Sequence, residues 1–313
     1  MKLFNFSLHL TFLTVGLLYA TSIRGEESST EDRETHYKNP PRVCVAQGKY
    51  NPNKDYFPNK LEIESESFSV EYHSNYKIVT NRKSKEEVVL LQCGTPLPDR
   101  QLGNKRKVIE IPVNRIAVLQ NSTASYLTLL GYPEVVKVNG SSSAPFLGAD
   151  GANGALRKPK DRSRGIKFTA PDEVIDEVDV VFTGHYNPAA KHVTVSEGKE
   201  KVPLRTTDWL GYYSLFINQE KRANRLIQET RTNYQCISKR MNELMDRHNA
   251  PRYRIGWIRV EPQADYNNHT ERWIFSTKKY KKGLSGDVGG DFLGNSTTHR
   301  MTDLQVAQSA MKE

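Results

Sequence analysis

The segment VPLRTTDWLGYYSLFINQEKRANRLIQETRTNYQC, residues 202–236, decides the fold that we expect for this chain. Apolar side chains recur in steps of three, four or seven, at Trp209, Tyr213, Phe216, Ala223, Ile227, Tyr234, Ile237, Met241 and Leu244. Thr207 stands where an N-cap belongs, and Asp208 places an acid in the first turn, where the helix dipole favours one. We therefore predict one long amphipathic helix of about 50 Å. Such a helix is typical of a spine between two lobes, and small ligands often bind between lobes.

The sequence before this helix predicts strands and then an alternation of strands and helices. Residues 68–80 and 87–92, joined by a polar turn, predict an antiparallel hairpin at the edge of a mixed sheet. The elements expected next are strand 116–119, helix 122–130, strand 135–138, helix 172–178 and strand 179–182. That order is typical of a parallel sheet with crossover helices.

The expected fold class is α/β, with two lobes. Its parts are a Rossmann-like N-terminal lobe at 43–205, the interlobe helix at 206–248 and a partial C-terminal lobe at 249–313. In the C-terminal lobe, strands are expected at 254–260 and 273–276, and a helix begins at Met301. An α/β lobe usually needs about a hundred residues, so we predict that this second lobe is truncated.

The N-terminus has the pattern of a secretory signal. Lys2 precedes an almost wholly apolar run, small residues follow it, and residues 1–25 are therefore expected to be removed. This removal takes away Lys2 and Arg24 and no acid, so the formal net charge falls from +9 to +7. Residues 26–42 are polar and predict a disordered leader. We expect an exported chain without a membrane span.

Sequons and cysteines fit an exported chain. Candidate glycosylation sites in Asn-X-Ser/Thr triplets lie at Asn121, Asn139, Asn268 and Asn295. Three cysteines remain after processing, Cys44, Cys93 and Cys236, and they allow one disulfide at most. All three pairings stay open. No nucleic-acid-binding motif, Gly-X-Ser-X-Gly elbow, Walker loop or His-Glu-X-X-His helix occurs, so we expect neither nucleic-acid binding nor the corresponding enzyme classes.

Several segments resemble the class III periplasmic binding proteins, the iron-siderophore and cobalamin receptors of ABC importers. EYHSNYKIVT and VVLLQCGTPLP resemble the family's opening hairpin, and EIPVNRIAVLQNSTASYLTLLGY resembles its first parallel strand and helix. PLRTTDWLGYYSLFINQEKRANRLI is similar to the family's helix entry and is the most specific match. GLSGDVGGDFLGN resembles the first α/β turn of the second lobe. The resemblance runs from about Tyr56 to the C-terminus and suggests a secreted, fungal member.

The resemblance implies capture of a small ligand, such as an iron chelate, between two rigid lobes by a monomer, with no catalysis, cofactor or bound metal. The residues that would line the cleft are Ser122, Thr123, Ser141, Thr183 and His185. The helix start at Ser122 would favour an anionic or carbonyl-bearing ligand. A glycan on Asn121 would block the crevice, so glycosylation there competes with ligand binding. The alternative function is a secreted scaffold or effector that retains the fold without transport.

Overall fold

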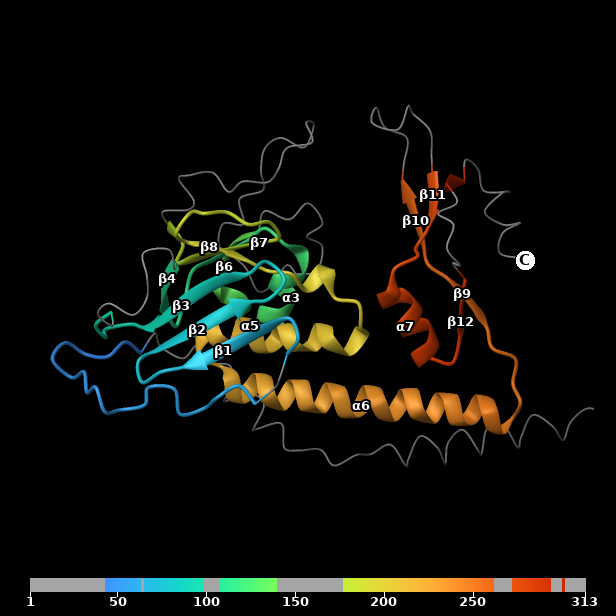
Figure 1. The fold of residues 1–313 in the computed structure, drawn as a ribbon, viewed down its shortest axis with the longest axis horizontal. Coiled ribbons are helices and arrows are strands. Elements are labelled where there is room, and N and C mark those ends of the chain that lie inside the picture. The colour runs from blue at the N-terminus through green and yellow to red at the C-terminus, as the bar shows by residue number, and fades with distance from the viewer. Residues whose placement is uncertain are drawn as a thin grey trace, which may run out of the picture. The chain divides into compact units, whose positions relative to one another are not determined.

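The structure is a computed structural model that describes residues 43–62, 65–97, 107–139, 177–261, 272–293 and 300–301. All of them belong to one compact unit, Arg42–Glu313, and Figure 1 draws them in colour. The expected signal and leader lie outside the described residues. So do most of the predicted helix at 172–178 and three candidate site residues, Ser141, Asn268 and Asn295.

The first sheet has four strands in the order β1-β2-β3-β4 (Figure 1). Their bounds are β1 Phe68–Tyr72, β2 Tyr76–Asn81, β3 Glu86–Gln92 and β4 Lys107–Ile111. β1, β2 and β3 pair antiparallel, whereas β4 joins β3 in parallel. β2 and β3 confirm the predicted hairpin in a mixed sheet, but residues 68–80, predicted as one strand, form two strands, β1 and β2, that pair with each other. The hairpin turn ends at Lys85, whose backbone is left-handed with φ 60°.

The second sheet is parallel throughout, in the order β6-β5-β7-β8. Its strands are β5 Ile116–Val118, β6 Val136–Asn139, β7 Val180–Thr183 and β8 His192–Thr194. Helix α3 (Asn121–Leu129) and the 3-10 turn η1 (Pro133–Val135) connect β5 to β6, and α3 ends before Gly131, whose φ is +86°. All residues of β5, β7 and β8 are buried, as expected for strands covered on both faces. The parallel α/β sheet is confirmed, and β8 was not predicted.

The single long helix predicted over 202–236 is wrong, because the segment folds as three pieces. These are the 3-10 turn η3 (Pro203–Thr207), helix α5 (Asp208–Ile217) and helix α6 (Glu220–Arg247). The break lies at Asn218, whose left-handed backbone (φ 54°, ψ 44°) ends α5. Thr207 is the N-cap residue of α5, as predicted, but it makes no side-chain cap: its backbone angles are helical, and its hydroxyl donates to the carbonyl of Leu204 at 2.6 Å.

The two helices differ in burial, which explains why the chain turns between them. Every residue of α5 is buried, and its aromatic side chains pack on the second sheet, with the Phe182 ring 5.1 Å from Tyr213 and 5.0 Å from Phe216. A helix that is apolar all round belongs in a core. α6 is amphipathic and lies alongside α5, to which Arg231 ties it by a 2.5 Å ion pair with buried Asp208 (Figure 1).

A buried lysine of the first sheet, Lys77, binds the segment where α5 ends and α6 begins. The Lys77 ammonium donates to Leu215 O at 3.0 Å, Asn218 Oδ1 at 2.8 Å and Glu220 Oε1 at 2.5 Å. Its Nζ also lies 4.5 Å from the centre of the Phe57 ring. The side chains of Lys77 and Glu220 are 0% and 3% exposed, so this is an ion pair in the core.

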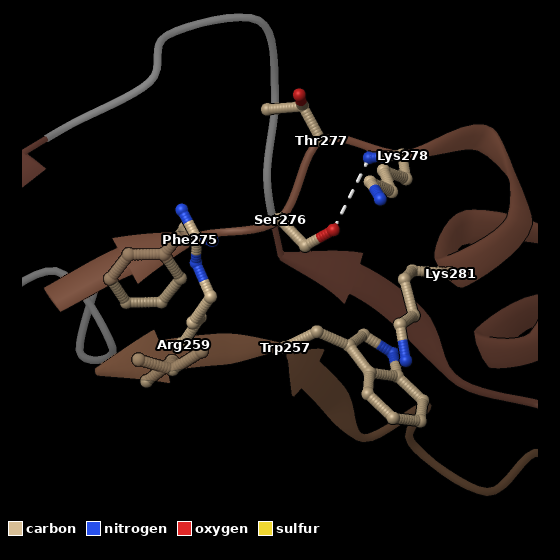
Figure 2. A pocket seen from close by; sticks show the side chains of 8 residues that line it. Trp257, Arg259, Phe275, Ser276, Thr277, Lys278 and Lys281 are labelled. Carbon is tan, nitrogen blue, oxygen red and sulfur yellow. Dashed lines mark hydrogen bonds between the residues drawn. The ribbon is translucent and has the colours of Figure 1, made fainter. Parts of the chain in front are cut away.

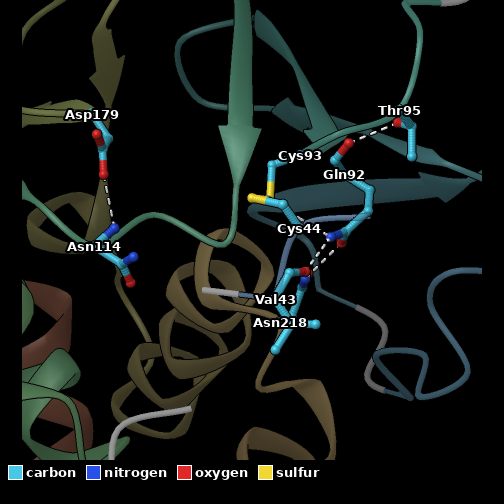
Figure 3. The surroundings of a disulfide bond; sticks show 8 residues. All are labelled: Val43, Cys44, Gln92, Cys93, Thr95, Asn114, Asp179 and Asn218. Carbon is cyan, nitrogen blue, oxygen red and sulfur yellow. Dashed lines mark hydrogen bonds between the residues drawn. A yellow bond between two sulfur atoms is a disulfide. The ribbon is translucent and has the colours of Figure 1, made fainter. Parts of the chain in front are cut away.

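The N-terminal segment is held by a disulfide between Cys44 and Cys93, and Cys236 is an exposed free thiol. Figure 3 shows Gln92 beside this bridge. The Gln92 amide nitrogen donates to Val43 O at 3.0 Å, and its oxygen accepts from Asn218 Nδ2 at 3.0 Å. The residues at the disulfide are thereby connected to the C-terminal end of α5.

The C-terminal segment combines a parallel and an antiparallel sheet. Its elements are β9 Arg254–Gly256, β10 Ile258–Glu261, β11 Arg272–Phe275, α7 Lys279–Asp287, β12 Asp291–Leu293 and β13 Arg300–Met301. β9 pairs with β12 in parallel, and β10, β11 and β13 form an antiparallel sheet. Met301, the first residue of a predicted helix, pairs opposite Trp273 instead, and the rest of that helix lies outside the described residues. Tyr234 of α6 donates to Asp287 of α7 at 2.7 Å.

Candidate functional site at the carboxyl edge of the parallel sheet

The carboxyl ends of β5, β7 and β8 bring three loops together. Leu119 N donates to Phe182 O at 2.9 Å, and Val195 N donates to Thr183 O at 2.8 Å. The loops after β5 and β7 also touch: a Cβ added at Gly184 would fall 1.5 Å from the side-chain nitrogen of Gln120. Ligands of open parallel sheets bind at such an edge.

Four residues at this edge form a hydrogen-bonded group, which we name the Glu197 cluster: Ser122, Thr123, Glu197 and Tyr213. Glu197 is only 7% exposed, and its Oε1 accepts from Ser122 Oγ at 2.6 Å and from the Tyr213 hydroxyl at 3.2 Å. The Tyr213 oxygen is also 2.9 Å from Thr123 Oγ1. Glu197 Oε2 is buried, and within the described part of the chain it has no hydrogen-bond partner.

The electrostatics of the cluster differ from those expected at a helix start. Burial, followed by the charge of Glu197, raises the pKa of Tyr213 well above its usual value, so this hydroxyl stays protonated and donates. The carboxylate lies against Ser122 in the first turn of α3, where the helix dipole favours a negative charge. The chain thus supplies its own anion to α3, and the geometry does not support the expected preference for an anionic ligand.

The structure places the predicted site residues in different environments. Ser122 is half-buried, Thr183 is buried at the end of β7, and His185 is exposed, with its backbone N–H 3.4 Å from Thr183 Oγ1. These three lie on the loops of the same edge. Thr123 is fully buried, so its hydroxyl contacts Tyr213 rather than solvent. Of the sequon residues, Asn121 begins α3 and Asn139 ends β6.

Sequence reasoning missed Glu197 and Tyr213 as site residues. Glu197 belongs to the polar stretch SEGKEK, in which no periodicity marks one acid from another. Tyr213 lies on the predicted apolar face of the long helix and could not be told from a core residue. Within the described residues, no three His, Cys, Asp or Glu side chains gather as a metal site would require. No helix described there is both long and apolar enough to cross a membrane.

Comparison with known proteins gives only distant structural likenesses. No family model and no curated protein matches the chain. A periplasmic binding protein from Veillonella parvula DSM 2008 is 11% identical, with a TM-score of 0.38, and the match covers 63% of each chain. An ABC transporter substrate-binding protein from Listeria monocytogenes EGD-e is 13% identical, with a TM-score of 0.36 over 63% of this chain and 72% of that one. These likenesses are partial and assign neither a family nor a ligand.

Proposed function

We propose that this chain is an exported, non-enzymatic protein that binds a small ligand at the carboxyl edge of its parallel sheet. The observation that carries the proposal is the Oε2 of Glu197 at that edge, which has no hydrogen-bond partner among the described residues. A buried polar atom without a hydrogen bond destabilises the fold by about 1–3 kcal/mol, and more when the group is charged. A donor supplied by a ligand would remove this penalty on binding.

The cluster favours a ligand that donates hydrogen bonds. Both Ser122 and Tyr213 already donate to Glu197, so the remaining oxygen accepts and does not attract an anion. Among iron chelates, this chemistry fits a neutral or cationic hydroxamate with N–H groups better than an anionic carboxylate complex. Exposed His185, on the loop after β7, adds a second polar group at the edge.

Calorimetric titration of the full chain with three iron chelates tests this proposal: neutral ferrichrome, cationic ferrioxamine B and anionic ferric citrate. We expect saturable binding of at least one hydroxamate, and weaker binding of ferric citrate. Glu197→Gln should weaken hydroxamate binding about tenfold, because a bond to a charged acceptor is lost. Glu71→Gln, which removes the same charge from an exposed position on β1, should leave the affinity unchanged.

A scaffold or effector function is the second candidate, and one observation favours it. The hydroxyls of Ser122 and Thr123 both have partners inside the protein, so neither needs a ligand. If the titrations with all three chelates gave only heats of dilution, this result would support a scaffold function and contradict the capture of iron chelates.

A further inference from the structure

A cavity of about 430 Å³ lies in the C-terminal segment and shares no residue with the Glu197 cluster. It is lined by the residue between β9 and β10, by residues of β10 and β11, by the loop that follows β11 and by the start of α7, namely Trp257, Ile258, Arg259, Phe275, Ser276, Thr277, Lys278 and Lys281 (Figure 2). Its volume falls in the range of roughly 300–1,000 Å³ that is typical of small-molecule sites. We name it the Trp257 pocket.

The described lining of the Trp257 pocket is basic. Lys278 and Lys281 contribute two ammonium groups, and none of the eight described lining residues is Asp or Glu. Within the residues that the structure describes, neither Lys278 nor Lys281 has an ion pair with an acidic side chain. The pocket therefore carries a net positive charge that an anion would neutralise.

One wall of the pocket is aromatic and held in place. The ammonium of Lys281 lies 3.8 Å from the centre of the Trp257 ring, and Figure 2 shows its side chain beside the indole. Trp257 Nε1 donates to Ser285 Oγ at 3.0 Å, which in turn donates to Lys281 O at 3.0 Å. The bond to Ser285 fixes the indole against α7.

Two hydroxyl groups just before the N-terminus of α7 add further hydrogen-bond donors to the pocket. Ser276 and Thr277 line the pocket, and Ser276 Oγ lies 3.4 Å from the backbone nitrogen of Lys278. Lys278 is also the N-cap residue of α7 and makes no side-chain cap. Ammonium and hydroxyl donors that line one pocket suit a tetrahedral oxyanion, which accepts several bonds at once.

From these observations we propose that the Trp257 pocket binds a small organic phosphate whose apolar ring packs on Trp257. The charge follows from the two lysines and from the absence of acid among the described lining residues. The ring follows from the half-buried indole, which inorganic phosphate alone would leave uncovered. A dianionic phosphate gains more than a monoanionic sulfate from two ammonium groups.

Titration of the full chain with phenyl phosphate tests the pocket, followed by calorimetry and by the indole N–H signals in NMR spectra. The signal that disappears in Trp257→Phe should shift on binding, whereas that of buried Trp209 should not. Lys281→Met and Lys278→Met should each weaken binding about tenfold, as expected for loss of a charge-assisted bond. Lys282→Met, on the same helix but outside the lining, is the matched control and should bind as the wild type does.

Each comparison can overturn the proposal. No saturation by roughly 10 mM phenyl phosphate would overturn it, because a dissociation constant above that concentration is too weak for a specific site. If Lys282→Met lost as much affinity as the pocket variants, the binding would be general charge attraction without a site. If inorganic phosphate or phenol bound as tightly as phenyl phosphate, the pocket would not recognise the phosphate and the ring together. If phenyl sulfate bound as tightly as phenyl phosphate, the expected preference for a dianion would be contradicted. Because Lys278 is exposed, its variant tests the pocket even if Lys281→Met misfolds. None of these results bears on the Glu197 cluster, with which the pocket shares no residue.

Discussion

Replacement of Lys77 by Met should destabilise the protein far more than loss of a surface ion pair. In the native state all three N–H groups of this ammonium are used, by Leu215 O, Asn218 Oδ1 and Glu220 Oε1. Methionine fills a similar volume but donates nothing. The variant would leave the Glu220 carboxylate, whose side chain is 3% exposed, without its cation.

The expected loss of unfolding free energy is about 3–5 kcal/mol, the range for breaking a buried ion pair from one side. The double variant Lys77→Met/Glu220→Gln removes the uncompensated charge. It should recover at least about 2 kcal/mol of that loss, because the two sites are directly coupled. Full recovery is not expected, since Leu215 O and Asn218 Oδ1 still lack their donor.

Urea unfolding at equilibrium, followed by the fluorescence of buried Trp209, measures these differences. Lys60→Met is the matched control. Lys60 pairs with Asp55 at 2.7 Å, but the two side chains are 40% and 52% exposed, so the expected loss is below about 1 kcal/mol.

Two results would refute this reasoning. If Lys77→Met lost no more stability than Lys60→Met, the native ion pair would not hold the helix break. If the double variant were no more stable than Lys77→Met, the penalty would not come from the stranded carboxylate of Glu220.

Three further predictions follow from single features. Burial lowers the pKa of His192 below its usual 6.5, so its protonation favours unfolding. The unfolding free energy of the wild type should fall relative to His192→Gln as the pH drops from 6.5 through the lowered pKa, and a constant difference across that window would contradict this. Reduction of Cys44–Cys93, which are 49 residues apart, should remove about 4 kcal/mol in chemical denaturation. Gly94→Ala should lower the melting temperature, because φ is +78° and the added Cβ would lie 2.1 Å from the carbonyl of Val45; an unchanged melting temperature would show that the backbone can shift.

The sequence predicted those parts of the fold that local periodicity determines. The hairpin of β2 and β3 and the parallel strands β5 to β7 have runs of apolar residues bounded by turn signals. The break at Asn218 could not be predicted in this way. The apolar spacing continues across it, and the left-handed residue is held by Lys77 and Gln92, which are distant in sequence.

The site was predicted less completely than the fold. Strand order placed Ser122, Thr183 and His185 near one edge, because carboxyl ends of parallel strands meet. Thr123 was expected to face the cleft, but a helix start presents only some of its side chains outward, and this one points to Tyr213. Glu197 reaches the edge only through β8, a strand of three residues with no clear sequence signal.

The position of Glu197 also reverses a common inference about helix starts, and this reversal can be measured. A free helix N-terminus attracts anions, but here the carboxylate at Ser122 has already neutralised the start of α3. Glu197→Gln removes that charge while it keeps an oxygen that can accept from Ser122 and Tyr213. We therefore expect the variant to bind ferric citrate several-fold more tightly than the wild type, and ferrichrome more weakly, when both are titrated by calorimetry. Parallel changes for the two chelates would contradict the electrostatic account, because a general loss of structure affects both ligands in the same direction.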